Sequence, residues 1–249
     1  MRPAKLHQLA FSALTAVSAC LLSSCETTTT RTTSTRSLPA YEPPVARTDF
    51  QTVRTTAYTH SESDHLEYGR RNALGTRLYA ASRPIQNASY TARALPVGAS
   101  GSQVSSGQER SIASYLAPQK RKVTRWVKGK RGKRKKVTVT EYVRPTIGSA
   151  AADWSRFPSG TIFRVLSTGQ IYKVDDYGWA LAGRNTIDLY MDSRGAMNTW
   201  GVRHEPVQIL RWGNEFESRR VLSGRQGYKH VRRMLLGLDG QHDAAAALR

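Results

Sequence analysis

The chain has 249 residues, with 38 Lys and Arg against 18 Asp and Glu, and a formal net charge of +20 at pH 7. Its two cysteines both lie within the first 25 residues, which excludes a disulfide framework for the remainder of the chain. The length allows one domain of ordinary size with extensions.

Residues 1–24 are predicted to be a lipoprotein signal peptide. Arg2 and Lys5 precede an uncharged apolar run over 9–22, which is too short to span a membrane and typical of a signal-peptide core. The run leads into Leu22-Ser23-Ser24-Cys25, the small-residue pattern that precedes the acylated cysteine of bacterial lipoproteins. We expect the lipid on Cys25. Cys20 fits the same pattern and is the alternative, as is an ordinary signal peptide followed by a free thiol.

The residue after the expected lipid site predicts the location of the chain. Glu26 stands where inner-membrane lipoproteins typically have Asp. We therefore expect a lipid-anchored protein of the cell envelope, on the outer membrane and facing the periplasm.

A polar tether and a series of short strands follow. Residues 25–48 are rich in Thr, Ser and Pro and predict a disordered tether. Strand-like segments separated by turn residues occupy 49–59, 161–166, 170–174, 179–182, 187–191 and 206–210. Residues 192–201 predict a short helix with Asp192 or Ser193 as its N-cap. This pattern predicts a mainly β fold, a small closed barrel built from 49–80 and 143–213.

The segment 81–142 is predicted to be an insertion that contains a basic β-hairpin. Two runs of alternating β-branched residues, 123–127 and 137–143, flank a Gly-containing turn. From Lys120 to Lys136 the sequence has eleven Lys or Arg and no acid. In an exported protein such a hairpin would meet anionic envelope polymers or lipid headgroups, so we expect no nucleic acid partner. A solvated hairpin without a partner is the alternative. The tail, 214–249, predicts one short amphipathic helix over 228–238.

Several acids cluster between residues 174 and 192. Strand alternation puts Ile187 and Leu189 on one face and Asp188 on the other. Asp176 ends the preceding strand just before Gly178, where we expect a sharp turn. A tight connection would then bring the two carboxylates together, and repulsion with partial burial would raise the pKa of one of them. Solvated turn acids are the alternative.

Three blocks of sequence resemble the three-aspartate (3D) domain family. They are AADWSRFPSGT (151–161), DYGWALAGRNTIDLY (176–190) and AMNTWGVRHEPVQIL (196–210), in the order and approximate spacing of that family. Asp153, Asp176 and Asp188 match its namesake aspartates. TAYT (56–59) and NALGT (72–76) look like its opening strand and turn. The resemblance implies a six-stranded double-psi β-barrel similar to the barrel domain of murein lytic transglycosylase A.

The resemblance also implies an activity. It is cleavage of the glycosidic bond between N-acetylmuramic acid and N-acetylglucosamine in peptidoglycan, without a cofactor, by a lytic transglycosylase. Asp188 would be the general acid, and Asp176 would hold its pKa up. The residues expected to bind substrate or support the site are Tyr58, Asp153, Asp175 and Gly178.

Departures from the family pattern keep a second function open. Trp179 replaces a Gly, Ala182 replaces a Lys, and one extra residue separates Asp176 from Asp188. The alternative is a non-catalytic lipoprotein that binds peptidoglycan or has a structural role.

One further group of residues has side chains of metal-ligand types. His60, Glu62, Asp64 and His65 are closely spaced, but no second cluster completes a tetrahedral set, so we expect a solvated loop and no metal.

Overall fold

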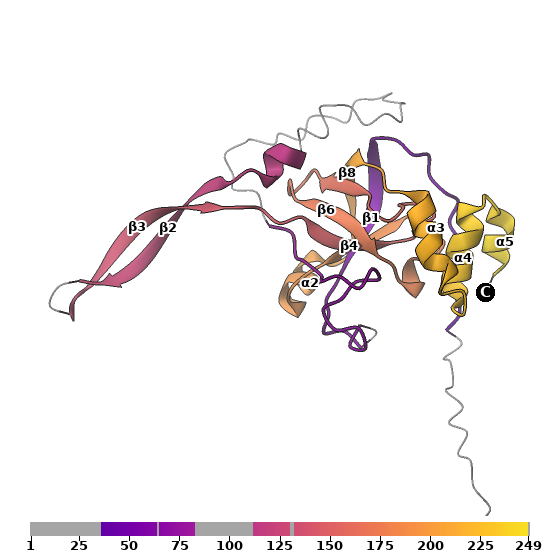
Figure 1. Cartoon of the computed structure of the whole chain (residues 1–249), viewed down its shortest axis with the longest axis horizontal. Helices are drawn as coiled ribbons and strands as arrows, with labels where there is room; N and C mark the ends of the chain where they lie inside the picture. The colour runs from indigo at the N-terminus through magenta and orange to yellow at the C-terminus, as the bar shows by residue number, and fades with distance from the viewer. Residues whose placement is uncertain (1–35, 64, 83–111, 130–131, 249) are drawn as a thin grey trace, which may run out of the picture. The chain divides into compact units, whose positions relative to one another are not determined.

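Six strands close into a mixed β-barrel, so the predicted mainly β barrel class is confirmed (Figure 1). A computed structural model describes residues 36–63, 65–82, 112–129 and 132–248. The order around the barrel is β1-β7-β4-β6-β5-β8. The strands are β1 (Phe50–Tyr58), β4 (Gly148–Ala152), β5 (Ile162–Val165), β6 (Ile171–Asp176), β7 (Thr186–Tyr190) and β8 (Arg203–Arg211).

Strand directions in the barrel are mixed. β1 runs parallel to β7, and β4 runs parallel to β6. The other four neighbouring pairs, β1–β8, β4–β7, β5–β6 and β5–β8, are antiparallel. Closure pairs every barrel strand on both sides and leaves no open sheet edge. One consequence matters for the site: β4 separates β6 from β7, although these two follow one another among the strands of the sequence.

The barrel interior is a single apolar cluster to which all six strands contribute. Alternating side chains of each strand point inward and are almost fully buried. They include Val53, Ala150, Ala152, Phe163, Val165, Tyr172, Val174, Ile187, Leu189, Val207 and Ile209. Small side chains on β4 leave room for large neighbours, and a Cβ on Gly148 would lie 2.6 Å from the ring of Tyr172.

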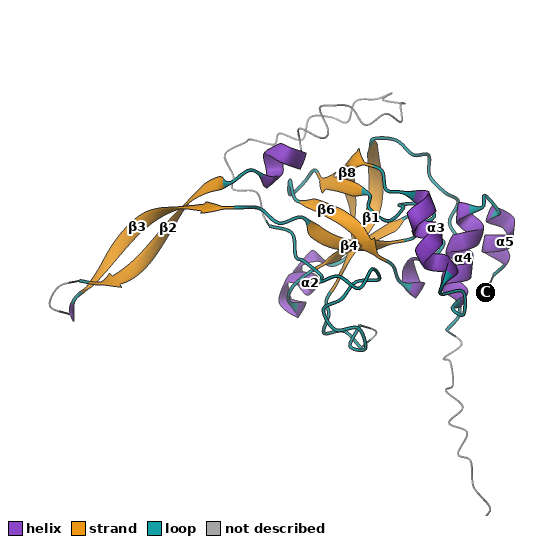
Figure 2. Ribbon diagram, in the orientation of Figure 1, coloured by secondary structure: helices purple, strands orange, loops and turns teal. Residues whose placement is uncertain are grey.

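Helices extend this core. α2 (Arg194–Trp200) begins at Ser193, whose side chain accepts a hydrogen bond from the backbone N–H of Ala196 as the expected N-cap. α3 (Glu215–Ser223), α4 (Lys229–Leu238) and α5 (His242–Ala247) follow β8 and lie together beside the barrel in Figure 2. Leu222, Val231 and Met234 bring α3 and α4 into the barrel's apolar cluster.

The structure corrects the element predictions at several places. Residues 179–182 are not a strand, because Trp179–Leu181 forms the short 3-10 helix η2. β4 was not predicted, since GSAAA has none of the β-branched or aromatic residues that mark strands. The tail has three helical segments, α3, α4 and α5, where one was expected.

The expectation of disorder does not hold for residues 37–48. This stretch has no regular secondary structure, but hydrogen bonds fasten it to the folded chain. The backbone N–H of Glu42 donates to the carbonyl of Gly183 (2.8 Å), and the Glu42 carboxylate accepts from the N–H of Asn185 (2.7 Å). Arg233 donates to the carbonyl of Pro39 (2.6 Å). The polar groups of the 183–185 turn and Arg233 of α4 therefore hold this segment in place.

The basic hairpin forms a sheet of its own. β2 (Gln119–Lys128) and β3 (Arg134–Val143) pair antiparallel along their whole length, with Gln119 opposite Val143 and Lys128 opposite Arg134. Among the described residues no barrel strand pairs with either of them. In the described part of the chain, no helix has the length and apolar character that a membrane span requires.

Candidate acid site on the barrel wall

Asp176 and Asp188 lie in one row across the outer face of the barrel. Ala151 on β4 is the register partner of Asp176 on β6 and also of Asp188 on β7. Thr56 on β1 continues the row as the partner of Asp188. Partners in register project to the same side of a sheet, so the two aspartates flank the methyl group of Ala151 with their Cα atoms about 10 Å apart, two strand spacings.

A β-bulge places Asp175 and Asp176 on this same face. The register between β4 and β6 shifts after Ala150, which pairs with Val174, so that Ala151 pairs with Asp176 and Asp175 is the extra residue. Without the bulge, Asp176 would follow Val174 in alternation and point into the apolar interior. Bulges re-aim side chains in this way and are common beside active sites.

Asp176 is nearly buried and accepts three hydrogen bonds. Tyr58 Oη donates to its Oδ2 (3.1 Å), and the backbone N–H groups of Ala73 and Tyr177 donate to its Oδ1 (3.0 Å each). These donors favour the ionised form, but burial outweighs them and raises the pKa of Asp176 to about 7, with Asp175 adding to the rise. The carboxyl thus ties β1 and the 72–76 turn to the end of β6.

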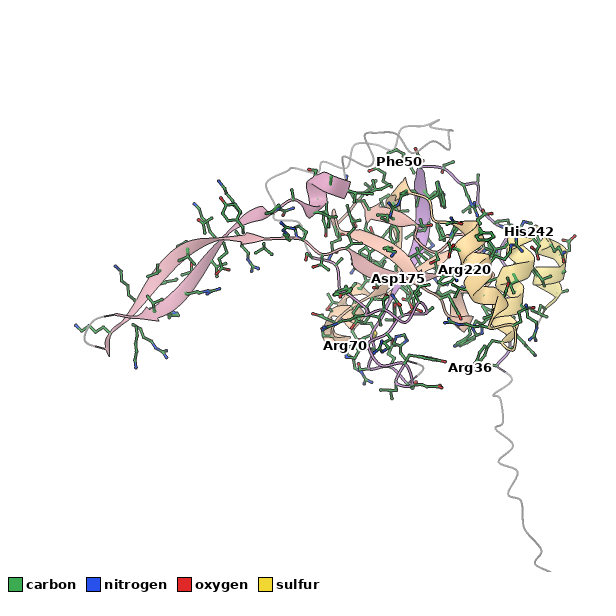
Figure 3. The ribbon with its side chains drawn as sticks, viewed as in Figure 1. Arg36, Phe50, Arg70, Asp175, Arg220 and His242 are labelled. Carbon is green, nitrogen blue, oxygen red and sulfur yellow. The ribbon has the colours of Figure 1, made fainter. Side chains whose placement is uncertain are left out.

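Asp175 occupies a neighbouring buried position. Ser149 Oγ donates to its Oδ2 (3.0 Å). Burial raises the pKa of Asp175 to about 6, against the opposing effects of Ser149 and Lys173. Figure 3 shows Asp175 on the side of the barrel where the loop that carries Arg70 lies. Asp175 and Asp176 therefore form a buried acidic pair with elevated pKa values.

Asp188 differs from this pair because it is partly exposed. Thr56 Oγ1 donates to its Oδ1 (2.7 Å). Burial of the carboxyl raises the pKa of Asp188 to about 7, Thr56 opposes the rise and the charge of Glu62 adds to it. When Oδ1 accepts from Thr56, the proton of the neutral acid lies on Oδ2. The arrangement can supply a proton near neutral pH.

The cause of this pKa shift corrects the sequence analysis. We expected repulsion from Asp176 together with partial burial. Burial is the main cause of the raised pKa, and the charge that adds to it is that of Glu62. β4 keeps Asp176 one strand further away, so no tight strand–turn–strand connection joins the two acids. Glu62 was considered only as a metal-ligand type, and nothing in its spacing from Asp188 predicts their interaction.

An apolar cluster beside the acids explains why burial dominates. Tyr58, Leu78, Leu181 and Tyr190 pack around Ala151 on the outside of the barrel. The rings of Tyr58 and Tyr190, partners on β1 and β7, meet edge to face with their centroids 5.5 Å apart. These side chains cover the wall beside Asp176, to which Tyr58 donates its hydrogen bond.

A polar chain borders the same cluster. Arg70 Nε donates to His60 Nε2 (3.2 Å), and because arginine only donates, His60 carries its proton on Nδ1. That Nδ1 lies 2.8 Å from the hydroxyl of Tyr190. Burial and then the charge of Arg70 lower the pKa of His60, which keeps the ring neutral. The Tyr190 hydroxyl therefore accepts from His60 and has its own proton available for another acceptor.

Asp153, the third namesake aspartate, lies apart from the row and is fully enclosed. Its carboxylate accepts from Ser155 N (2.7 Å), Ser155 Oγ (2.6 Å) and the N–H of Gly183. Arg156 Nε lies 3.7 Å from its Oδ2, and both side chains are buried. Burial raises the pKa of Asp153 while these partners oppose the rise. These contacts hold the 153–157 turn and Gly183 in position around the Asp153 carboxylate.

The predicted role of Gly178 as the turning point is wrong. Its backbone is extended, with φ −148° and ψ 156°, a conformation open to any residue. The left-handed glycine of this connection is Gly183, with φ +79°. A Cβ there would also lie 2.8 Å from the ring of Tyr41. Ala182, where the family pattern has Lys, is fully buried, and its carbonyl accepts a hydrogen bond from Arg233 Nη1 of α4 (3.3 Å).

Among the described residues, no three His, Cys, Asp or Glu side chains come close enough to hold a metal ion. Asp64, Cys20 and Cys25 lie outside the described residues. No protein family, no curated protein and no solved structure matches this chain.

Proposed function

We propose that the barrel cleaves peptidoglycan glycan strands as a lytic transglycosylase, with Asp188 as the general acid. The observation that carries the proposal is the state of that side chain. Asp188 combines partial exposure with a pKa of about 7, so that much of it is protonated near neutral pH and can reach a substrate. The double-psi connectivity and the 3D-type relationship implied by the sequence blocks belong to this proposal.

The reaction needs one carboxyl group. Asp188 gives its proton to the glycosidic oxygen as the bond from that oxygen to C1 of N-acetylmuramic acid breaks. The 6-hydroxyl of the same sugar forms the new bond to C1, and its proton passes to the Asp188 carboxylate. The product is an anhydro sugar, the acid is regenerated, and neither water nor a second catalytic carboxylate is consumed.

The neighbouring residues have supporting roles. Thr56 fixes the orientation of the Asp188 carboxyl through Oδ1. Tyr58 and Asp176 hold the wall and the 72–76 turn beside it. We place the chain in the cell envelope, where its substrate lies. A lipid on Cys25 would anchor it to the outer membrane, facing the periplasm.

The test is direct. Purified protein incubated with peptidoglycan should release anhydro-muropeptides detectable by mass spectrometry, and Asp188→Asn should not. Asp192→Asn, which removes an exposed carboxylate just after β7, is the matched control and should retain activity.

A second candidate function is glycan binding without cleavage. It is favoured by position 182, where the Lys of the family pattern is replaced by an alanine fully buried in the core. A protein that binds peptidoglycan but releases no anhydro-muropeptides, equally in wild type and Asp188→Asn, would establish this function instead.

A further inference from the structure

The register of the β2–β3 hairpin sorts its side chains onto two chemically different faces. Alternate residues of a strand point to opposite sides, and register partners share a side. One face, here called the valine face, consists of Gln119, Arg121, Val123, Arg125, Val127, Lys135, Val137, Val139, Glu141 and Val143. The other, here called the cationic face, consists of Lys120, Lys122, Thr124, Trp126, Lys128, Arg134, Lys136, Thr138, Thr140 and Tyr142.

The cationic face has five positive charges and, among its described residues, no acid and no aliphatic side chain. Its two aromatic rings are strongly exposed, Trp126 at 65% and Tyr142 at 67%. Lys120 Nζ lies 5.9 Å from the centre of the Tyr142 ring, opposite it in register. Figure 3 shows side chains projecting from both faces of this ribbon.

The rungs of this face follow one another in a line. From the base they read Lys120 with Tyr142, Lys122 with Thr140, Thr124 with Thr138, Trp126 with Lys136 and Lys128 with Arg134. Successive rungs on one side are about 7 Å apart, and the two strands are about 5 Å apart. The face is therefore a narrow track with a cation at four of its five rungs and a hydroxyl or a ring at four.

We infer that the cationic face binds a linear anionic polysaccharide laid along the ribbon. Lysine and arginine would pair with its carboxylates or phosphates, and Trp126 and Tyr142 would stack on sugar ring faces, since aromatic rings provide an apolar surface with a polar edge. This binding is independent of the acid site on the barrel.

The same geometry disfavours a membrane as the partner. Surface-bound segments bury an apolar face between acyl chains while cations border it. Here the five valines lie opposite the cationic face and share their own side with Arg121, Lys135 and the Arg125–Glu141 ion pair, which interrupt the apolar surface. The ribbon cannot present its aliphatic side chains and its cationic face to one lipid surface.

The test compares matched variants of the full chain, using fluorescein-labelled polygalacturonate and fluorescence anisotropy at low salt. Lys122→Gln with Lys136→Gln removes two charges from the cationic face, and we expect on the order of a tenfold loss of affinity and a weaker salt dependence. Arg121→Gln with Lys135→Gln removes two charges from the valine face and should change affinity less than threefold. Equal losses in both variants would overturn the inference, because net charge alone would then explain binding.

Further arms identify the partner and the role of the rings. Trp126→Ala should weaken binding of polygalacturonate more than binding of inorganic polyphosphate, which has no rings, whereas Val127→Ala should affect neither. Tighter binding to anionic phosphatidylglycerol vesicles, or to an oligodeoxythymidylate, than to polygalacturonate would overturn the inference in favour of a membrane or a nucleic acid. Release of anhydro-muropeptides is measured separately, so failure here leaves the proposed activity standing.

Discussion

Asp176 and Asp188 share a single register neighbour, Ala151, and so face the same side of the barrel without touching one another. Each has a pKa of about 7, and for each the first cause is burial of the carboxyl. Their environments separate their roles. Asp176 has its oxygens occupied by three donors, whereas Asp188 is partly exposed.

Asp188→Asn should abolish most of the activity. The amide keeps the shape and can still accept from Thr56, but it has no acidic proton to deliver. We expect a loss of about a hundred-fold or more in the rate of anhydro-muropeptide release. The unfolding midpoint in urea should stay unchanged or rise, because a buried charge is removed. Wild-type activity in this variant would exclude Asp188 as the acid.

Glu62→Gln should shift the pH dependence of activity. In the proposed reaction the active form of Asp188 is protonated, so the rate should fall as pH rises through its pKa. Removing the Glu62 charge lowers that pKa, and the alkaline limb of kcat/KM should move downward by up to about one pH unit. Gln retains an acceptor for the N–H of Thr59, which Glu62 now binds.

Two controls accompany that profile. Glu67→Gln removes the same charge from an exposed position in the same loop and should leave the limb in place. Asp176→Asn should also leave it in place, in contrast to the expectation from sequence, because β4 lies between the two acids and the charge that raises the pKa of Asp188 is that of Glu62. A shift with Asp176→Asn and none with Glu62→Gln would reverse this assignment.

Asp176 should make the protein less stable as pH rises. Its folded pKa of about 7 exceeds the value of about 3.9 for an unfolded aspartate, so the folded state binds the proton more tightly. The stabilisation is complete below about pH 4 and is lost as pH rises through 7. Asp176→Asn lacks this titration. The free energy of unfolding of the variant, measured in urea relative to that of wild type, should therefore rise by on the order of a few kcal/mol between pH 4 and pH 8. Asp192→Asn removes an exposed carboxylate, and its free energy of unfolding should depend on pH in the same way as that of wild type.

Asp153→Asn should impair folding and leave chemistry intact. Its carboxylate is buried with Arg156 and holds Ser155 and Gly183, so neutralising it leaves a buried guanidinium without its counter-charge. We expect a loss of about 2 to 4 kcal/mol in the free energy of unfolding. The activity of the fraction that remains folded should match wild type. A folded, fully stable but inactive variant would place Asp153 in the catalytic machinery instead.

Cys25 should carry the lipid. Metabolic labelling with a fatty-acid probe is expected to mark wild type and Cys20→Ser but not Cys25→Ser. Labelling that survives in Cys25→Ser and disappears in Cys20→Ser would move the processing site five residues upstream.

The sequence was informative where side chains alternate in a simple way. Ile187 and Leu189 are buried and Asp188 points outward, as the period of two predicts. It was uninformative about β4, whose Gly and Ala residues are small because both faces of the strand are covered. Register between distant strands is set by tertiary packing. No local sequence pattern therefore predicts that Asp176 and Asp188 flank Ala151, or that Glu62 acts on the pKa of Asp188.

The bulge at Asp175 makes the acid site depend on residue count as well as residue type. Val174 faces inward and Asp176 outward only because one unpaired residue stands between them. Deleting Asp175 would restore strict alternation and turn Asp176 into the barrel core, so that the loss of one codon would remove two acids from the wall. Substitutions at position 175 leave the bulge in place, so Val174 still faces inward and Asp176 still faces outward. In descendants of this chain, the side chain at position 175 can thus vary while the number of residues between Val174 and Asp176 is fixed.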